Sequence, residues 1–294
     1  MDIDAYACMV SMTELLQLLG MNAVAYSTAP YNYSISKTLI REGCIARTLP
    51  DDCPSENSKF IIVDVSDPSF LEKCISIENT IAVYDHHVGF EKFWNDRIGN
   101  GTHIEFIGSA ATLIYREWKK AGLQDKMTSE TAKLIIAAIL DNTLNLTATN
   151  TTDEDGKAFY ELCYRYHIGK EWCAAYFAEV QGNIEDDLKN AMLGDVKFIR
   201  DNQILPSRIG QLAVWNADRI ICNLSDICLW FNERFDEWMI NIIDIGNNCC
   251  YFVCENEEYR RKIAKVFDVQ FDAKVAKTKC SYLRKEIIKI TMQL

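Results

Sequence analysis

The chain has 294 residues and a formal net charge of −11, with 49% hydrophobic and 25% charged residues. This length is long for one hydrophobic core, so we expect two domains. The acidic balance argues against binding of long nucleic acids, which are held mainly by Lys and Arg. It leaves room for a small phosphorylated substrate beside bound cations.

No membrane span or export signal is evident in the sequence. No run reaches about 18 consecutive apolar residues, and the N-terminus lacks a basic signal region. We therefore expect a cytoplasmic protein with no membrane partner. The 12 cysteines include no Cys-x-x-Cys pair, so we expect reduced thiols in the core rather than a zinc ribbon or a disulfide framework.

The first half of the chain alternates predicted helices and strands. Helical spacing of apolar residues begins directly after Asp2 and Asp4, which places both acids at the positive end of a helix. Helices are expected at 5–19, 36–42, 69–76, 112–120, 129–141, 170–180 and 185–192, and strands at 22–26, 60–64, 80–84 and 103–107. This alternation predicts a parallel sheet with helices on both faces.

The second half has a different character, with more strands per residue. Strands are expected at 197–200, 209–215, 238–245, 249–254 and 283–290, and helices at 225–237 and 257–267. Asn247-Asn248 lies between two of the strands and predicts a hairpin turn. We place the domain boundary so that the first domain spans residues 1–188 and the second spans 189–294.

Acidic residues and a histidine pair stand at the ends of several apolar elements. Asp85-His86-His87 and Asp64 each follow a predicted strand, Asp141 ends a predicted helix, and Asp2 and Asp4 begin one. Judged alone, each is more simply a solvated loop or helix-end group. Together they predict one site, because carboxylate oxygens and imidazole nitrogens suit Mn²⁺ or Mg²⁺, and a shared carboxylate can bridge two ions.

These motifs resemble the DHH phosphoesterase superfamily, in the branch with a DHHA2-type second domain. That branch includes the manganese-dependent family II inorganic pyrophosphatases and the prune-like exopolyphosphatases. The matching segments are Asp2-Ile3-Asp4-Ala5, Val63-Asp64, Asp85-His86-His87, Gly108-Ser109-Ala110-Ala111-Thr112, residues 138–144, Thr152-Asp153, Asp195-Val196-Lys197-Phe198 and Leu283-Arg284-Lys285. The resemblance covers most of the chain. It implies a parallel-sheet DHH domain, a smaller α/β DHHA2-like domain and an active site in the cleft between them.

The resemblance also implies a set of metal ligands for two Mn²⁺ or Mg²⁺ ions. Asp2 would bind one ion and Asp4 the other, and Asp64 would bridge both. His86 and Asp141 would complete the ligands of the second ion. The implied reaction is a two-metal phosphohydrolysis of a small substrate such as pyrophosphate or short polyphosphate.

Further residues are implied to contact the substrate. His87 would face the substrate phosphate, and Asp85 would steady the imidazoles from behind. Lys197, Arg284 and Lys285 would clamp the distal phosphate, the arginine through its planar fork of donors.

Departures from the family pattern keep other functions open. Family members carry a histidine ahead of the first motif, after a strand, whereas here only Met1 precedes Asp2. True loss of that strand and histidine would leave one metal site short of a ligand. If the start of the chain is instead assigned too far downstream, the ligand would not be lost. Val65-Ser66-Asp67 replaces the usual His-Asn-Glu, and Leu283 and Glu286 replace the outer residues of the usual Ser-Arg-Lys-Lys.

Two alternative functions follow from these departures. One is an exonuclease or phosphodiesterase acting on short oligonucleotides with the same metal centre. The other is a non-catalytic protein that binds a phosphate ligand with a degraded metal site. The oligomeric state is not settled by the sequence, and a homodimer stays open.

Overall fold

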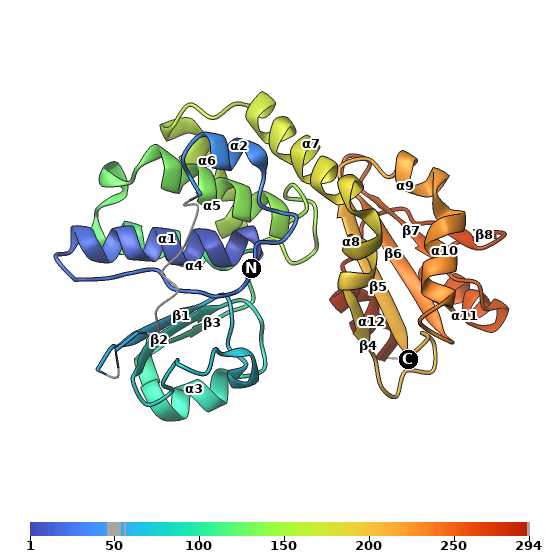
Figure 1. Ribbon diagram of the computed structural model, residues 1–294, viewed down its shortest axis with the longest axis horizontal. Helices are drawn as coiled ribbons and strands as arrows, with labels where there is room; N and C mark the ends of the chain where they lie inside the picture. Colours follow the sequence, from blue (N-terminus) through green and yellow to red (C-terminus); the bar gives the residue numbers. More distant parts are fainter. Residues whose placement is uncertain (46–53, 56, 293–294) are drawn as a thin grey trace. The chain divides into compact units, whose positions relative to one another are not determined.

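The computed structural model describes residues 1–45, 54–55 and 57–292 (Figure 1). The chain folds into two compact units. The first comprises Met1–Leu146 with Asn150–Tyr176, and the second comprises Thr147–Thr149 with Phe177–Leu294. The predicted boundary at residues 188–189 stays a prediction, as does the predicted cleft between the domains.

The first unit contains a three-stranded parallel sheet. Its strands are β1 (Phe60–Val63), β2 (Thr80–Asp85) and β3 (Thr102–Ile104), in the order β1-β2-β3. Phe, Ile, Val and Tyr dominate β1 and β2, and such β-branched and aromatic side chains favour a covered parallel sheet. The carboxyl ends of parallel strands meet at one edge, so the residues that follow β1 and β2 lie together.

Helices cover both faces of this sheet (Figure 1). Helices α1 (Ile3–Leu18), α4 (Ala110–Ala121), α5 (Ser129–Asn142) and α6 (Asp153–Arg165) lie on one side, and α3 (Glu91–Ile98) lies on the other. The smaller face buries Ile62, Val83 and Trp94 in one cluster. The larger face contains α5, whose residues 134–140 are fully buried. The predicted parallel α/β first domain is therefore confirmed.

The second unit is built on a six-stranded mixed sheet. Its order is β4 (Val196–Phe198), β5 (Arg208–Val214), β6 (Trp238–Asp244), β7 (Cys249–Val253), β9 (Val275–Lys277) and β8 (Phe271–Asp272). Strands β5 and β6 are parallel, and the other neighbours are antiparallel. Every residue of β6 is buried, which makes this strand the centre of the unit's core.

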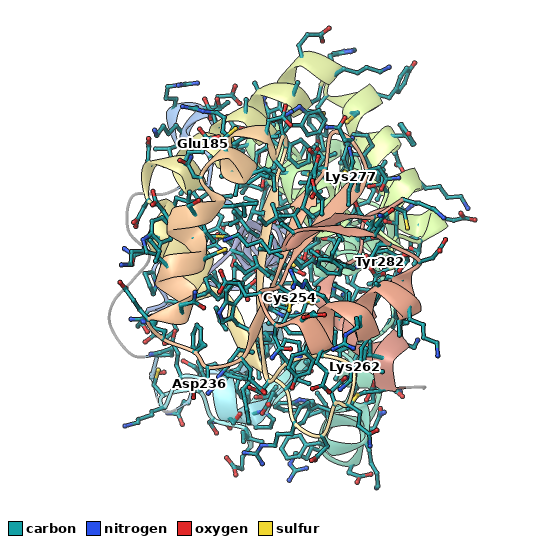
Figure 2. All side chains as sticks on the ribbon, turned by 90° about the vertical axis from the view of Figure 1, so that its right-hand side faces the viewer. Glu185, Asp236, Cys254, Lys262, Lys277 and Tyr282 are labelled. Atoms are coloured by element: carbon teal, nitrogen blue, oxygen red, sulfur yellow. The ribbon has the colours of Figure 1, made fainter. Side chains whose placement is uncertain are left out.

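Helices pack around the second sheet. They are α8 (Leu188–Gly194), α9 (Asp218–Cys222), α10 (Leu224–Asn232), α11 (Glu257–Phe267) and α12 (Arg284–Met292), and the end of α7 (Lys170–Asp186) also belongs to this unit. Figure 2 faces this unit and labels Cys254, which is fully buried, and Lys262 on α11. Cys249, Cys250 and Cys254 are buried free thiols, as predicted for this run.

Three predicted elements are wrong. Residues 22–26 form no strand, and Val24 is 66% exposed, so this short apolar run packs against no sheet. The helix expected at 69–76 is only a 3-10 turn, Pro68–Phe70, after which Leu71 is extended, and Glu72 accepts a hydrogen bond from Thr28 N at 2.7 Å through its side chain. Residues 284–292 form α12 rather than a strand.

The last error has a clear physical reason. The buried residues of α12 are Arg284, Ile287 and Thr291, which recur at helical spacing, and no Gly or Pro interrupts the segment. Helix α3 was not predicted, although Trp94 anchors it by full burial and by an indole N–H that donates to the Ser66 carbonyl oxygen at 2.7 Å. The composition of residues 50–55, with two Pro, two Asp and a Ser, also predicts a loop, which lies mostly outside the described residues.

The lengths and apolar content of the helices bear on membrane insertion. Within the described part of the chain, no helix is both long and apolar enough to cross a bilayer. The cytoplasmic location stays a prediction.

Candidate metal centre

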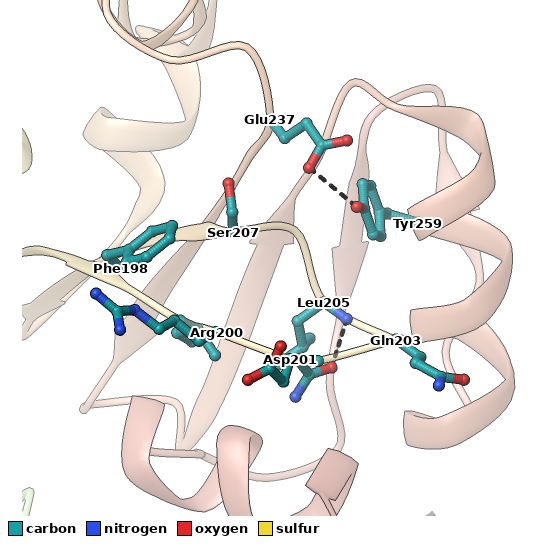
Figure 3. Close-up of a pocket in the computed structure, with 10 residues that line it drawn as sticks. Phe198, Arg200, Asp201, Gln203, Leu205, Ser207, Glu237 and Tyr259 are labelled. Carbon is teal, nitrogen blue, oxygen red and sulfur yellow. Dashed lines mark hydrogen bonds between the residues drawn. The ribbon is translucent and has the colours of Figure 1, made fainter.

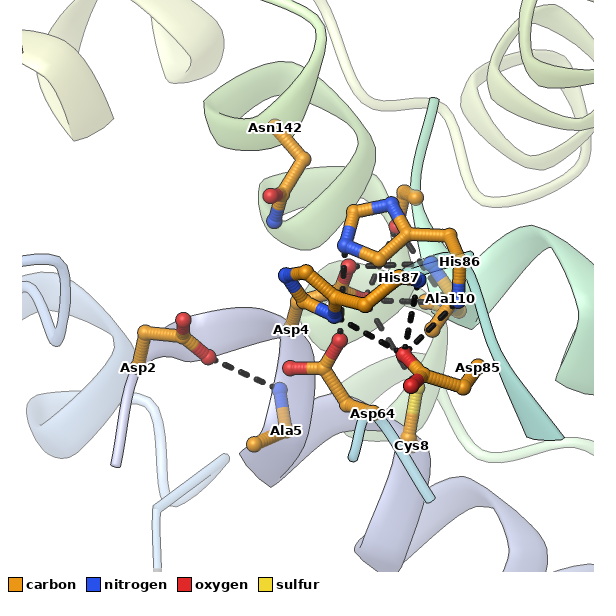
Figure 4. A network of polar contacts seen from close by, with 12 residues as sticks. Asp2, Asp4, Ala5, Cys8, Asp64, Asp85, His86, His87, Ala110 and Asn142 are labelled. Atoms are coloured by element: carbon orange, nitrogen blue, oxygen red, sulfur yellow. Dashed lines mark hydrogen bonds and ion pairs between the residues drawn. The ribbon is translucent and has the colours of Figure 1, made fainter. Parts of the chain in front are cut away.

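The centre of the site is the edge of the sheet where β1 and β2 end. Asp64 follows β1 and has a φ of 58°, a left-handed conformation that Asp adopts more readily than most residues. His86 follows β2 on the neighbouring strand. Because the strands are parallel, the two side chains meet, and His86 Nε2 lies 3.5 Å from Asp64 Oδ1 (Figure 4).

His86 is held in one tautomer by the backbone. Its Nδ1 lies 2.9 Å from the Gly108 carbonyl oxygen and 3.3 Å from that of Ile107. Carbonyl oxygens only accept, so Nδ1 carries a proton, and the lone pair of the neutral form lies on Nε2. That lone pair faces Asp64, which is the arrangement of a metal-binding histidine whose other nitrogen is fixed by a carbonyl.

Asp85 is a fully buried carboxylate that organises the histidine pair. Its Oδ1 accepts hydrogen bonds from His86 N at 2.8 Å, His87 N at 3.1 Å and His87 Nδ1 at 2.9 Å. Burial acts to raise the pKa of Asp85, but the interactions with His87 and Ser66 together outweigh it and hold this pKa below its ordinary value. Asp85 is therefore an anion that orients His87, the contact its predicted steadying role requires.

Three side chains at this edge could hold a metal ion. Asp64, His86 and His87 each offer one ligand atom, and these atoms lie within 4.8 Å of one another. Among the described residues, buried oxygens Asp64 Oδ1 and Asp85 Oδ2 have no hydrogen-bond partner. A carboxylate oxygen beside imidazole nitrogens is a donor set that Mn²⁺ accepts, so the residues present fit such an ion.

Asp2 and Asp4 bring the start of α1 to the same place. Asp2 caps α1, and its Oδ1 accepts from Ala5 N at 3.0 Å. Asp4 is fully buried and accepts from Ser109 Oγ, Ala110 N and Ala111 N, each at 2.9 Å, at the start of α4. This predicted ligand therefore also joins α1 to α4 (Figure 4).

Asp141 lies in the last turn of α5. Tyr176 Oη lies 3.0 Å from Asp141 Oδ1 and 3.1 Å from the Ser34 carbonyl oxygen, and either oxygen can accept its proton. Burial and the charge of Asp2 raise the pKa of Asp141 to about 7, and the hydrogen bond from Tyr176 opposes this rise. Asp141 is thus electrostatically linked to Asp2, the N-cap of α1.

The carboxylates of the site repel one another. Burial and the neighbouring Asp2 raise the pKa of Asp4 to about 7. Burial, followed by the charges of Asp4, Asp2 and Asp85, raises the pKa of Asp64 well above its ordinary value. A bound divalent cation would reverse this field, because it stabilises every deprotonated carboxylate around it.

The predicted phosphate-binding residues lie in the second unit. Lys197 on β4 and Lys285 on α12 are exposed. Arg284 is buried, and its guanidinium donates to Asp195 Oδ1 at 2.6 Å and to the carbonyl oxygens of Asp195 at 2.7 Å and Ile209 at 3.3 Å. The structure therefore gives Arg284 partners that join α12 to β5, and its role toward phosphate stays a prediction.

We expect Arg284→Ala to destabilise the second unit by about 1–3 kcal/mol, the usual cost of leaving buried acceptors unpaired. Urea unfolding would measure this loss. The neighbouring Lys285→Ala should change the free energy of unfolding by less than about 0.5 kcal/mol, as expected of an exposed side chain. Equal stability of Arg284→Ala and the wild type would contradict the structural assignment.

A separate cavity of about 580 Å³ opens on the second unit near the end of β4 (Figure 3). Phe198, Arg200 and Ser207 line it, and across it Tyr259 Oη donates to Glu237 Oε2 at 3.0 Å. None of the predicted site residues is among the described residues that line this cavity.

Comparisons with known proteins bear on this arrangement. No protein-family model matches the chain. A probable manganese-dependent inorganic pyrophosphatase of Staphylococcus haemolyticus (strain JCSC1435) is 25% identical over 283 residues, covering 92% of this chain and 88% of that protein. A protein of the same name from Staphylococcus aureus (strain JH9) is 23% identical over 298 residues, covering 94% and 89%. The chain is therefore similar in sequence to proteins named probable manganese-dependent inorganic pyrophosphatases.

A solved structure shares the fold. It is a Methanococcus jannaschii protein assigned to the family II inorganic pyrophosphatases, and it aligns over 100% of this chain and 96% of its own with a TM-score of 0.67 at 18% identity. The resemblance predicted from the motifs and the predicted fold class are thus confirmed. The roles of individual site residues stay predictions.

Two residues that contact the predicted site or its supporting turn were missed from the sequence. Asp155 is buried and hydrogen-bonded to the turn that follows β3, and Tyr176 contacts Asp141. The spacing Thr152-x-x-Asp155 carries the signature of a capping box, so a local signal existed for Asp155. No local pattern distinguishes Tyr176 from the other aromatic residues of α7.

We expect Tyr176→Phe to weaken Mn²⁺ binding most at acidic pH. Without the phenolic hydrogen bond, the pKa of Asp141 should rise further. A larger fraction of Asp141 is then protonated at acidic pH, and this proton must be displaced when the ion binds. Calorimetric titration at pH 6.5 and 8.5 would measure this, with most of the affinity regained at pH 8.5. Tyr166→Phe is a matched control, because it removes a hydrogen bond of 2.7 Å to the Met127 carbonyl oxygen. Equal losses in both variants, or a loss independent of pH, would contradict the expectation.

Proposed function

We propose that the chain is a manganese-dependent phosphohydrolase that cleaves the phosphoanhydride bond of pyrophosphate or short polyphosphate. One observation carries the proposal. Asp64, His86 and His87 bring their ligand atoms within 4.8 Å at the edge of a parallel sheet, in a chain that aligns over 92% of its length with a probable manganese-dependent pyrophosphatase. Asp2, Asp4 and Asp141 would add carboxylate oxygens and allow two ions.

A divalent cation in this site would neutralise charge on phosphoryl oxygens and lower the pKa of water. The chain itself supplies the rest. His86 offers its Nε2 lone pair because the Gly108 carbonyl oxygen holds the proton on Nδ1. Asp64 offers Oδ1, a buried oxygen without a hydrogen-bond partner among the described residues. The two metal-binding atoms, His86 Nε2 and Asp64 Oδ1, are thus oriented before an ion binds, which lowers the reorganisation that catalysis requires.

His87 is the proposed contact to the substrate. Its side chain is 63% exposed, while its Nδ1 is hydrogen-bonded to the buried Asp85 at 2.9 Å. Because Nδ1 is engaged by the Asp85 carboxylate, Nε2 is the ring nitrogen left to face a phosphate oxygen. Lys197 and Lys285 are exposed cations suited to the distal phosphate, whereas Arg284 would have to leave Asp195 to reach it.

The test is a substrate panel under defined metal conditions. Pyrophosphate, short polyphosphate, a mononucleotide and a dinucleotide are each incubated with Mn²⁺, with Mg²⁺ and with chelator. We expect phosphate release from pyrophosphate or short polyphosphate with Mn²⁺ and none with chelator. Preferential cleavage of the dinucleotide would replace the proposal by the phosphodiesterase alternative. Metal binding without turnover of any substrate would replace it by the binding-protein alternative.

A further inference from the structure

A single buried carboxylate holds the turn on which two proposed metal ligands rest. Asp155 is fully buried in the first turn of α6. Two of its hydrogen bonds cap its own helix, from Thr152 N at 2.8 Å and Thr152 Oγ1 at 2.7 Å. Three others leave the helix and reach Gly108 N at 2.9 Å, Ser109 N at 3.3 Å and Thr112 Oγ1 at 2.6 Å. A helix cap alone does not explain these three.

The turn at residues 108–112 contacts His86 and Asp4 directly. The carbonyl oxygen of Gly108 accepts from His86 Nδ1 at 2.9 Å, while the amide of the same residue donates to Asp155. Ser109 Oγ donates to Asp4 Oδ1, as described above. The peptide units of one residue therefore connect Asp155 to the ring whose Nε2 faces Asp64.

Little free space surrounds this connection. A Cβ added at Gly108 would lie 2.6 Å from Thr143 Cγ2 and 2.7 Å from Asp155 Oδ2. Asn150 Nδ2 supports the same carbonyl oxygen at 3.3 Å. Because Gly108 N donates to Asp155 and Gly108 O accepts from His86 Nδ1, losing the Asp155 contact would free the residue whose carbonyl oxygen sets the tautomer of His86.

We propose that Asp155 is a positioning residue that fixes the tautomer and ring orientation of His86 through Gly108. Asp155 would act on metal affinity rather than on substrate. This inference rests on the proposed function only in the choice of Mn²⁺ as the ion. A carboxylate is needed because its two oxygens accept five hydrogen bonds. An asparagine would replace one of those acceptors by an NH₂ donor that faces other N–H groups.

The test compares Asp155→Asn with Thr152→Ala. Mn²⁺ affinity is measured by calorimetry, and the tautomer of His86 is read from imidazole ¹⁵N shifts in metal-free protein, where only four histidines contribute. Asp155→Asn should lower the affinity roughly 10- to 100-fold, the usual effect of losing a partner that orients a ligand, and should mix the tautomers. Thr152→Ala removes a side-chain cap of α6 but leaves Asp155 on the turn, so both readouts should match the wild type within about twofold.

Specific results would overturn the proposal. Wild-type affinity and a single His86 tautomer in folded Asp155→Asn would do so, as would equal losses in Thr152→Ala, which would reduce Asp155 to a helix cap. If Asp155→Asn fails to fold, Thr112→Val carries the test, because it removes one donor from the turn and leaves the cap intact. It should lower the affinity several-fold, and no change would reject the proposal.

The outcome is separable from that of the proposed function. A wild-type protein without turnover on the substrate panel would end the hydrolase proposal, yet the tautomer and Mn²⁺ affinity would still report on Asp155. Conversely, an active wild type with an unperturbed Asp155→Asn would end only the positioning role.

Discussion

Asp64→Asn should abolish manganese-dependent hydrolysis and at the same time stabilise the metal-free protein. Asn adopts the left-handed conformation seen at this position, with a φ of 58°, as readily as Asp, so the backbone should be unchanged. The substitution removes a carboxylate whose pKa is raised by burial and by Asp4 and Asp2, so a repulsive charge is lost. The new amide can also donate to His86 Nε2, which lies 3.5 Å from Oδ1 of the native side chain.

The expected loss of turnover with Mn²⁺ is at least about 100-fold. Removing a residue that only orients a metal ligand costs up to about 100-fold, and removing a residue that binds the ion should cost more. Steady-state phosphate release would measure it, and thermal unfolding in chelator should show a higher midpoint than the wild type. Asp96→Asn is the matched control, since Asp96 on α3 is 61% exposed and pairs with Lys92 at the surface. Turnover near the wild-type rate in Asp64→Asn would defeat the assignment of the metal centre.

The residues at the edge of the first sheet could be predicted from the sequence because the strands and the helix that carry them have strong local patterns. The runs that lead to Asp64 and Asp85 are unbroken apolar strands, and two such strands in a parallel sheet must deliver their next residues to one edge. This rule alone pairs His86 with Asp64. The start of a helix after Asp2 could be predicted in the same way, because an N-cap residue and apolar residues at helical spacing occur together.

What the sequence could not predict depends on tertiary contacts. The hydrogen bonds of Asp4 to Ala110 and Ala111 join segments more than 100 residues apart, and no periodicity reports them. Arg284 matched a phosphate-binding motif, yet its burial against Asp195 follows from α12 being a helix, which the apolar alternation at the end of the chain disguised. Where the apolar residues of a short segment fit both helical and strand spacing, tertiary packing decides which of the two structures forms.

The stability of the metal-free protein should fall as pH rises from about 4 to about 7, and Mn²⁺ should reverse this trend. The pKa values of Asp4 and Asp141 are raised to about 7 in the folded protein from an ordinary value of 3.8. A raised pKa in the folded state contributes stability that is fully present below the ordinary value and is lost as pH rises through the folded value. Each such group lowers the free energy of unfolding by at most about 1.4 kcal/mol per pH unit within this window.

Manganese should act in the opposite direction because it binds the deprotonated carboxylates. At a free concentration of about 100 times its dissociation constant, the ion should add about 2.7 kcal/mol, and this gain should shrink as acid protonates the ligands. Thermal unfolding at pH 5.5, 7 and 8, with chelator and with Mn²⁺, would measure both effects. Asp141→Asn keeps an acceptor for Tyr176 but removes one titrating group, so its metal-free stability should depend less on pH. A metal-free protein more stable at pH 8 than at pH 5.5, or a Mn²⁺ effect of equal size at both, would show that these acids do not share one cation-binding site.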